Sequence, residues 1–266
     1  MKNTYVSIFK MQFKGELQYR AKAISGIATQ FFWGIMYIYL YMAFMSSDTI
    51  DGFTITQMAS YIWLGQAFFF FFSPGIHKNA GYEITNGNIC YKFTRPINLY
   101  NQWYTEYLGE KLASTLLRFL PIIIISILLP TKYSLSMPAN FTAFILFLIS
   151  LIIGGLLCVA ISMYSVYLTF ITLSPKGTTT IVATIANLLG GAIIPIPLMP
   201  TSIQSILNFL PFRYISDLPF RIYIGNIGIS DGLVQIAISI VWLIIIIVSG
   251  KLLIKNALKK TIIQGG

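Results

Sequence analysis

Residues 143–159 read AFILFLISLIIGGLLCV and contain no Asp, Glu, Lys or Arg. Residues 181–196 and 233–248 are two more stretches without these charged side chains. A helix of about 20 apolar residues crosses the hydrocarbon core of a bilayer, which is about 30 Å thick. Only 10% of the 266 residues are charged, whereas soluble domains contain about 25%. The sequence therefore predicts an all-α, polytopic membrane protein.

Apolar segments suited to a membrane span occur six times along the chain. Six spans place both termini on the same side of the membrane. Neither a repeat of short period nor a low-complexity linker interrupts the spans, so residues 1–266 are expected to form one membrane domain. The predicted spans are residues 23–45, 56–73, 101–129, 140–171, 178–196 and 231–254.

The distribution of basic residues predicts the orientation of these spans. Thirteen Lys and Arg residues lie in segments on the side of the termini, and three lie on the opposite side. Segments rich in Lys and Arg remain in the cytoplasm, so both termini are expected there. The same rule accounts for the net charge of +10, and nucleic acid is not an expected partner.

Residues 4–20 are predicted to form a helix that lies on the cytoplasmic face of the membrane. An apolar side chain recurs every four residues, and basic side chains flank this stripe. Such a pattern suits the interface of an anionic leaflet; a frayed tail is the alternative. The stripe contains Tyr5, Phe9, Phe13 and Leu17, and the flank contains Lys10 and Lys14.

Residues 76–96, between the second and third spans, are too polar to enter lipid and too long for a simple turn. Asn and Gly at 86–88 favour a turn, and Pro96 disfavours helix at the residue before it. A short stiff element between these two breaks is predicted to project into the cytoplasm. It would offer Glu83, Lys92 and Arg95 to a protein partner; an ordinary positively charged loop is the alternative.

The third span carries Glu106, Glu110 and Arg118 on one stripe of its helix. Charged side chains within a membrane helix are costly and usually face protein or water. The stripe could contact the interface helix, line an inward cavity, or be solvated below the membrane. Arg118 lies within the apolar half of the span. Glu110, Arg118 and Asn187 of the fifth span are therefore the candidate pathway or buried polar residues.

Small residues recur at four-residue spacing in the fourth span, a pattern that lets helices approach closely. We expect packing within the chain, with a subunit interface as the alternative. Beyond the fifth span, prolines interrupt residues 197–230, whose apolar segments are too short to cross a bilayer. They are expected to form re-entrant or interfacial helices on the outer side. The small residues are Ser150, Gly154, Cys158 and Ser162.

Side chains that carry chemistry are scarce in this sequence. The single histidine, His77, lies in a predicted loop and gives little support to a catalytic triad or a metal site. Cys90 and Cys158 make no metal-binding spacing. The sequence has no Gly-x-x-x-x-Gly-Lys-[Ser/Thr] phosphate loop, so another polypeptide must hydrolyse any ATP that drives this protein. No catalytic residue and no metal site are predicted.

Four features of the chain resemble the permease subunits of ABC-2 type ATP-binding-cassette transporters, in particular a bacterial branch with six spans. One of the two more specific features, together with the C-terminal ending given below, is residues 86–96, NGNICYKFTRP, which is similar to the branch's Gly-x-[Ile/Leu]-x-x-x-[Leu/Phe]-x-Arg-Pro signature. Cys90 and Phe93 fall within its variation. The other three are Tyr19-Arg20-Ala21-Lys22, the Pro-rich segments Ile194-Pro195, Leu198-Met199-Pro200 and Leu210-Pro211-Phe212, and the C-terminal Gln264-Gly265-Gly266.

This resemblance implies a dimer of permease subunits with two ATPase subunits bound below it. Residues 87–95 would form a coupling helix in a cleft of the ATPase, which adds Gly87, Asn88 and Pro96 to the candidate contacts. The interface helix would lie beside it, and residues 203–223 would form an outer gate. ATP and Mg²⁺ would bind the ATPase, not this chain. The branch favours a second permease of different sequence.

The sequence thus predicts a permease subunit of an ABC exporter in the bacterial plasma membrane. The expected substrate is an amphipathic small molecule, a peptide or a lipid-like molecule. An ion-coupled secondary transporter is an alternative, although Arg118 alone resembles the ionisable mid-membrane groups that it needs. An integral membrane enzyme acting on lipid is another, although its polar catalytic cluster is not found.

Overall fold

The computed structural model describes residues 2–44, 49–50, 53–94 and 96–260. The regular elements of this part of the chain are helices, except for one pair of two-residue strands, β1 (Thr49–Ile50) and β2 (Phe53–Thr54). The strands pair antiparallel, with Thr49 opposite Thr54. The prediction of an all-α fold is confirmed. The predicted contact residue Arg95 and the C-terminal residues 264–266, which carry part of the family resemblance, lie outside the described residues.

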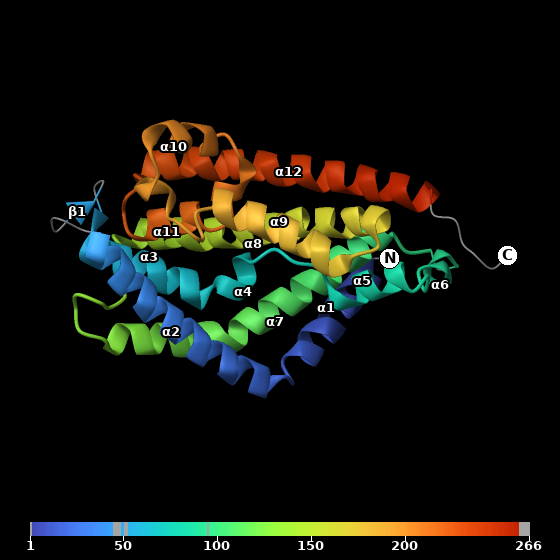
Figure 1. The fold of residues 1–266 in the computed structure, drawn as a ribbon, viewed down its shortest axis with the longest axis horizontal. Coiled ribbons are helices and arrows are strands. Elements are labelled where there is room, and N and C mark those ends of the chain that lie inside the picture. The colour runs from blue at the N-terminus through green and yellow to red at the C-terminus, as the bar shows by residue number, and fades with distance from the viewer. Residues whose placement is uncertain (1, 45–48, 51–52, 95, 261–266) are drawn as a thin grey trace.

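Four helices of the described chain are long and apolar enough to cross a membrane. They coincide with the first, third, fourth and sixth predicted spans. Helix α8 lies centrally and contacts α7, α9, α11 and α12, and Figure 1 shows α12 along one side of it with α7 and α2 on the other. The four helices are α2 (Arg20–Phe44), α7 (Leu99–Leu128), α8 (Phe141–Thr172) and α12 (Ile229–Lys260).

The second and fifth predicted spans form shorter helices. The second consists of α3 (Ile55–Ala67) and α4 (Phe69–Phe72), which are separated at Phe68. The fifth is α9 (Pro175–Leu189), and the chain then turns at Gly191, whose φ is +78°. A helix of 15 residues is about 23 Å long, which is shorter than the hydrocarbon core. Helix α3, with 13 residues, is shorter still. Neither helix by itself has the roughly 20 residues that are needed to cross the hydrocarbon core.

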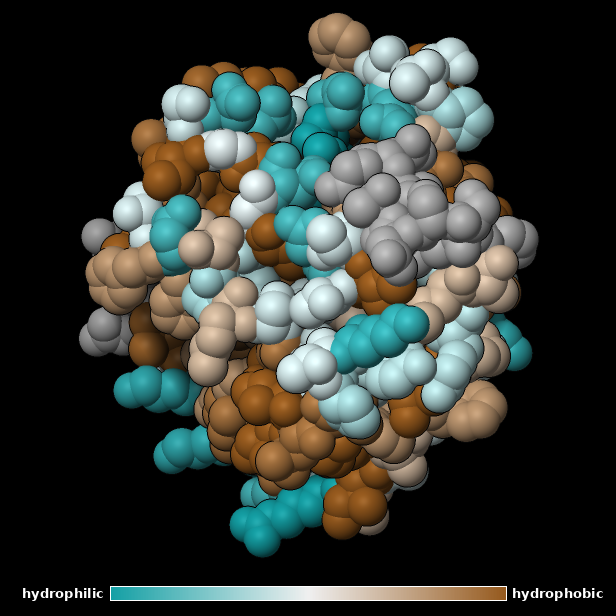
Figure 2. Space-filling view, turned by 90° about the vertical axis from the view of Figure 1, so that its left-hand side faces the viewer, coloured by the Kyte–Doolittle hydropathy of each residue, from teal (hydrophilic) through white to brown (hydrophobic). Residues whose placement is uncertain are grey.

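Short helices occupy the two ends of the molecule. Figure 1 shows α1, α5 and α6 at the end where α12 finishes, and α10 and α11 near β1 at the opposite end. Figure 2 looks onto the end that bears β1, where polar side chains gather above an apolar patch. These elements are α1 (Lys2–Glu16), α5 (Lys78–Thr85), α6 (Cys90–Phe93), α10 (Thr201–Leu207) and α11 (Asp217–Tyr223), with the 3₁₀ turns η1 (Ile196–Leu198) and η2 (Pro211–Tyr214).

Helix α1 ends at Glu16, four residues before the end predicted from the apolar stripe. A carboxylate oxygen of Glu16 accepts hydrogen bonds from Lys22 Nζ at 2.8 Å and from Ser114 Oγ at 2.9 Å. These bonds tie the turn between α1 and α2 to α7. A β-carbon at Gly109 of α7 would lie 3.1 Å from the backbone oxygen of Phe9. Helix α1 therefore packs on α7.

The small residues of the fourth span serve packing within the chain. A β-carbon at Gly154 would lie 2.3 Å from the backbone oxygen of Ile215, and one at Gly155 would overlap the ring of Phe71. The side chains of Ser150, Cys158 and Ser162 are buried. The structure therefore favours packing within the chain, which we expected, over a subunit interface for this face of α8.

Besides a larger apolar core that contains residues of α3, α8 and α11, the described chain has a smaller apolar core at the end that carries α1, and α5 belongs to it. Ala80 and Ile84 of α5 pack in this core with Trp103 of α7, Met163 of α8 and Ile254 of α12. The buried residues of α5 thus belong to one apolar cluster with residues of three long helices. The polar loop between α4 and α7 consequently has a defined position relative to the membrane helices.

Candidate functional site

Glu83 links the elements of the polar loop between α4 and α7. One oxygen of its carboxylate lies 2.7 Å from Lys92 Nζ of α6. The other accepts a hydrogen bond of 3.0 Å from the indole N–H of Trp103 in α7. The ammonium of Lys92 also lies 6.0 Å from the ring centroid of Trp103. Glu83 therefore stabilises the loop itself, because it joins α5, α6 and α7.

The remaining residues of the predicted contact set lie around the tip of this loop. Gly87 has a φ of +70°, which allows the chain to turn between α5 and α6. The backbone N–H of Ile89 closes this turn by donating to the carbonyl oxygen of Glu83 at 3.1 Å. Asn88 is half-buried and Pro96 is exposed. The predicted contact at Arg95 lies outside the described residues.

Three exposed aromatic side chains on the same loop were not in the predicted set. They are Tyr82 of α5, with Tyr91 and Phe93 of α6. Tyr91 is 73% exposed. On α5, the buried Ala80 and Ile84 place Tyr82 on the opposite face, and this helical spacing was available in the sequence. Helix α6 has four residues and gives no such pattern.

His77 precedes α5 and lies between two carboxylates of α7. Its Nδ1 is 3.5 Å from Glu106 Oε2, and its Nε2 is 3.5 Å from Glu110 Oε2. The side chain is buried, with 2% of its surface exposed. Burial lowers the pKa of the His77 imidazole to about 4, and the positive charge of Lys92 acts in the same direction. The sequence indicated only an ordinary loop histidine, whereas the structure places His77 against Glu106 and Glu110 of α7.

Residues of the predicted interface helix divide between contact with the protein and exposure. The hydroxyl of Tyr5 accepts a hydrogen bond of 3.2 Å from the backbone N–H of Asn98, at the start of α7. The rings of Phe9 and Phe13 stack with 5.7 Å between their centroids. Lys10 and Lys14 are exposed, as expected for the basic flank.

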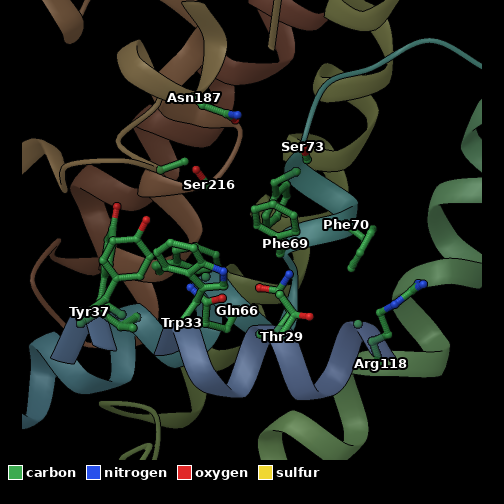
Figure 3. Close-up of a pocket in the computed structure, with 18 of the residues that line it drawn as sticks. Thr29, Trp33, Tyr37, Gln66, Phe69, Phe70, Ser73, Arg118, Asn187 and Ser216 are labelled. Atoms are coloured by element: carbon green, nitrogen blue, oxygen red, sulfur yellow. The ribbon is translucent and has the colours of Figure 1, made fainter. Parts of the chain in front are cut away.

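A cavity of about 580 Å³ lies between α2, the α3–α4 pair, α7 and α9. Figure 3 shows Trp33 and Tyr37 of α2 near one end of it and Arg118 of α7 near the other. Phe69 and Phe70 of α4 contribute aromatic rings to its wall. A cavity of this size that combines aromatic rings with a few polar groups is typical of a ligand site.

Arg118 and Asn187, two of the three candidate pathway residues, both line this cavity. Asn187 comes from α9 and lies across the cavity from α2 (Figure 3). Glu110, the third candidate, does not line the cavity and lies beside His77 instead. Of the three possibilities considered for this stripe of α7, two describe the structure. Ser114, which lies between Glu110 and Arg118 on the stripe, contacts α1, and Arg118 lines the cavity.

Within the described ranges, no group of three or more His, Cys, Asp and Glu side chains could hold a metal ion. Cys90 and Cys158 are both free thiols. At the end that carries α1, the predicted contact residues that the structure describes lie together in the polar loop formed by α5 and α6. The exposed rings of Tyr82, Tyr91 and Phe93 belong to the same loop.

A comparison with protein families matches residues 31–265 to the model described as ABC-2 family transporter protein. The chain belongs to the ABC-2 family of transporter proteins. Searches of curated proteins and of solved structures found no match. This ABC-2 transporter protein is therefore a membrane component of such a transporter, and its long apolar helices are those of a multi-pass membrane protein.

Proposed function

We propose that this ABC-2 transporter protein is the permease subunit of an ABC exporter and that a separate ATPase subunit powers it. The loop formed by α5 and α6 supports this proposal most strongly. It lies outside the apolar helices, its position is fixed by Glu83 and Trp103, and it presents Tyr91 and Phe93 outward. A rigid loop with exposed aromatic rings suits insertion into a cleft of another protein.

We infer six membrane crossings, with α3–α4 and α9 as the two that fall short of the length criterion. Successive loops alternate between the ends of the molecule. Gly81 lies against Pro175, which places the α8–α9 turn beside α5, whereas the backbone N–H of Ala139 bonds the carbonyl oxygen of Tyr223 at the opposite end. A short helix can cross where neighbouring protein satisfies the backbone next to it.

The same proposal assigns the remaining partners. Both termini and the α5–α6 loop lie in the cytoplasm of a bacterial cell, because the basic residues concentrate at that end. ATP and Mg²⁺ bind the ATPase. A second permease, of different sequence, completes the membrane part and covers exposed apolar helix faces. The short helices within residues 197–230 close the pathway at the outer end, and residues 1–266 act as one membrane domain.

Docking of the ATPase is tested by substitutions that leave the inner contacts of the loop intact. Tyr91→Ala and Phe93→Ala together are expected to reduce copurification of an ATPase that carries a phosphate loop by at least tenfold. Charge reversal at Glu83 is a poorer test, because it also breaks the contacts with Lys92 and Trp103. Affinity purification followed by quantitative mass spectrometry gives the readout.

Phe209→Ala is the matched control for this experiment. Phe209 is 79% exposed and lies between α10 and η2, at the opposite end of the molecule. It should leave copurification of the ATPase unchanged. Equal recovery of the ATPase with wild type and with the double variant would refute the docking assignment, and the absence of an ATPase from wild type would refute the proposed function.

A further inference from the structure

The cavity between α2 and α9 has an asymmetric distribution of charge. Lys22 and Arg118 line it, whereas no Asp or Glu is among the described residues that do. Lys22 is paired with Glu16 at 2.8 Å, so these two charges compensate each other. Arg118 forms no ion pair within the described chain, although Glu16 also acts on it electrostatically, so the three groups together carry one net positive charge.

Arg118 is buried without a counter-ion. Its side chain is 2% exposed, and none of the ion pairs of the described chain includes it. Its Nη1 and Nη2 donate to the carbonyl oxygens of Ser114 at 2.7 Å and Lys22 at 3.2 Å. The guanidinium lies 3.9 Å from the ring centroid of Phe70, and its Nε has no hydrogen-bond partner.

These contacts satisfy part of the hydrogen-bonding capacity of Arg118 but do not neutralise it. A buried positive charge without a counter-ion is costly, and in a membrane protein it usually marks a functional site. An anion in the cavity would remove this cost. A cation or a neutral molecule would leave it in place.

The rest of the cavity suits an apolar molecule. Its α2 wall extends from Lys22 to Tyr41, which corresponds to about 28 Å along a helix and so to most of the thickness of a bilayer core. Trp33 and Tyr37 line this wall, and Phe69 and Phe72 face it from α4. Aromatic rings of this kind bind apolar chains through large contact areas.

We propose that the cavity binds an amphipathic substrate with an anionic headgroup. The headgroup lies at Arg118, toward the end that carries α1, and the apolar part lies along the aromatic residues of α2 and α4. This assignment names the substrate class of the transporter and rests on its proposed function.

Tryptophan quenching tests the proposal on the complete transporter in nanodiscs of zwitterionic lipid. The probes are 11-bromoundecyl phosphate, 11-bromoundecanol and 11-bromoundecyl trimethylammonium, which share one chain and differ in headgroup charge. A β-carbon at Gly26 would lie 2.7 Å from Arg118 Nε. Trp33 lies seven residues further along α2, so about 10 Å along the helix axis separates Trp33 from the level of Arg118. The quenching that disappears in Trp33→Phe reports on the cavity.

The phosphate probe is expected to quench Trp33 at a concentration at least tenfold below that of the alcohol or the ammonium probe. Arg118→Gln should abolish this preference. Arg213→Gln, at another buried arginine that does not line the cavity, should retain it. Equal quenching by the three probes in wild type would overturn the proposal, and this comparison does not depend on the folding of any variant.

The ATPase activity of the same complex distinguishes a transported anion from a resident phospholipid. A substrate is expected to raise the rate of ATP hydrolysis at least twofold at the concentration that quenches Trp33. Selective binding with an unchanged rate would overturn the substrate assignment and indicate a bound lipid. The two proposals fail in different experiments. The proposed function fails if no ATPase copurifies with the protein, and the substrate assignment fails if the three probes quench equally or if the rate of ATP hydrolysis does not change.

Discussion

At the residue scale, His77 predicts a pH dependence of stability. Its imidazole binds a proton below about pH 6.5 in an unfolded chain but only below a pKa of about 4 in the folded protein. The unfolded state therefore binds more protons between these values, and stability falls as the pH falls through this window. The loss reaches about 3 kcal/mol, since one pKa unit corresponds to about 1.4 kcal/mol.

The melting temperature of wild type minus that of His77→Gln isolates this contribution. The difference should be larger at pH 7.5 than at pH 5, because only wild type loses stability through the imidazole. A difference that instead grows at pH 5 would contradict the prediction. It would show that Glu106 and Glu110, both within 3.5 Å of the imidazole, stabilise its protonated form.

The residues of the candidate site differ in how far the sequence could predict them. Arg118 and Asn187 were predicted because each is a polar group in an apolar stretch, and both line the cavity. The environment of His77 could not be predicted, because it depends on how the loop folds back onto α7. Tyr91 and Phe93 were missed since their exposure depends on the orientation of a single turn of helix.

At the element scale, close contact between α8 and the η2–α11 segment predicts the effect of a single methyl group. Gly154→Ala would place a β-carbon 2.3 Å from the backbone oxygen of Ile215, and a backbone atom cannot move aside as a flexible side chain can. We expect a loss of about 1–3 kcal/mol, measured as a lower melting temperature of the purified protein.

Gly15→Ala provides the control for Gly154→Ala. Gly15 is also helical, in α1, and a β-carbon there would meet nothing within 4 Å. Alanine should stabilise this helix by up to about 1 kcal/mol. If Gly154→Ala melted at the temperature of wild type while Gly15→Ala behaved as expected, α8 and η2 would not be in close contact.

The long helices could be predicted from the sequence more reliably than the short helices and the helix ends. Four spans were identified by long apolar stretches, since length and composition alone fix such helices. The break at Phe68 was not predicted, because this residue begins an uninterrupted run of phenylalanines that offers no turn signal. The early end of α1 was missed for a different reason. It depends on bonds from Glu16 to Lys22 and Ser114, which the periodicity of the helix does not contain.

At the scale of the whole molecule, the number of crossings determines which loops face the outside of the cell. With six crossings, Tyr91 and Ser174 lie inside, and Met137 and Phe209 lie outside. If only α2, α7, α8 and α12 crossed, Tyr91 and Ser174 would lie outside, Met137 would lie inside, and Phe209 would stay outside. Tyr91, Met137 and Ser174 therefore discriminate between the two topologies, and Phe209 serves as a positive control.

Single cysteines at these positions in a background that lacks Cys90 and Cys158 allow the topology to be measured. Met137 and Phe209 are 81% and 79% exposed, so a membrane-impermeant maleimide should label both in intact cells. Cysteines at Tyr91 and Ser174 should react only after the membrane is permeabilised. Labelling of Tyr91 and Ser174 but not Met137 in intact cells would establish four crossings. The α5–α6 loop would then face away from ATP, and no cytoplasmic ATPase could bind it.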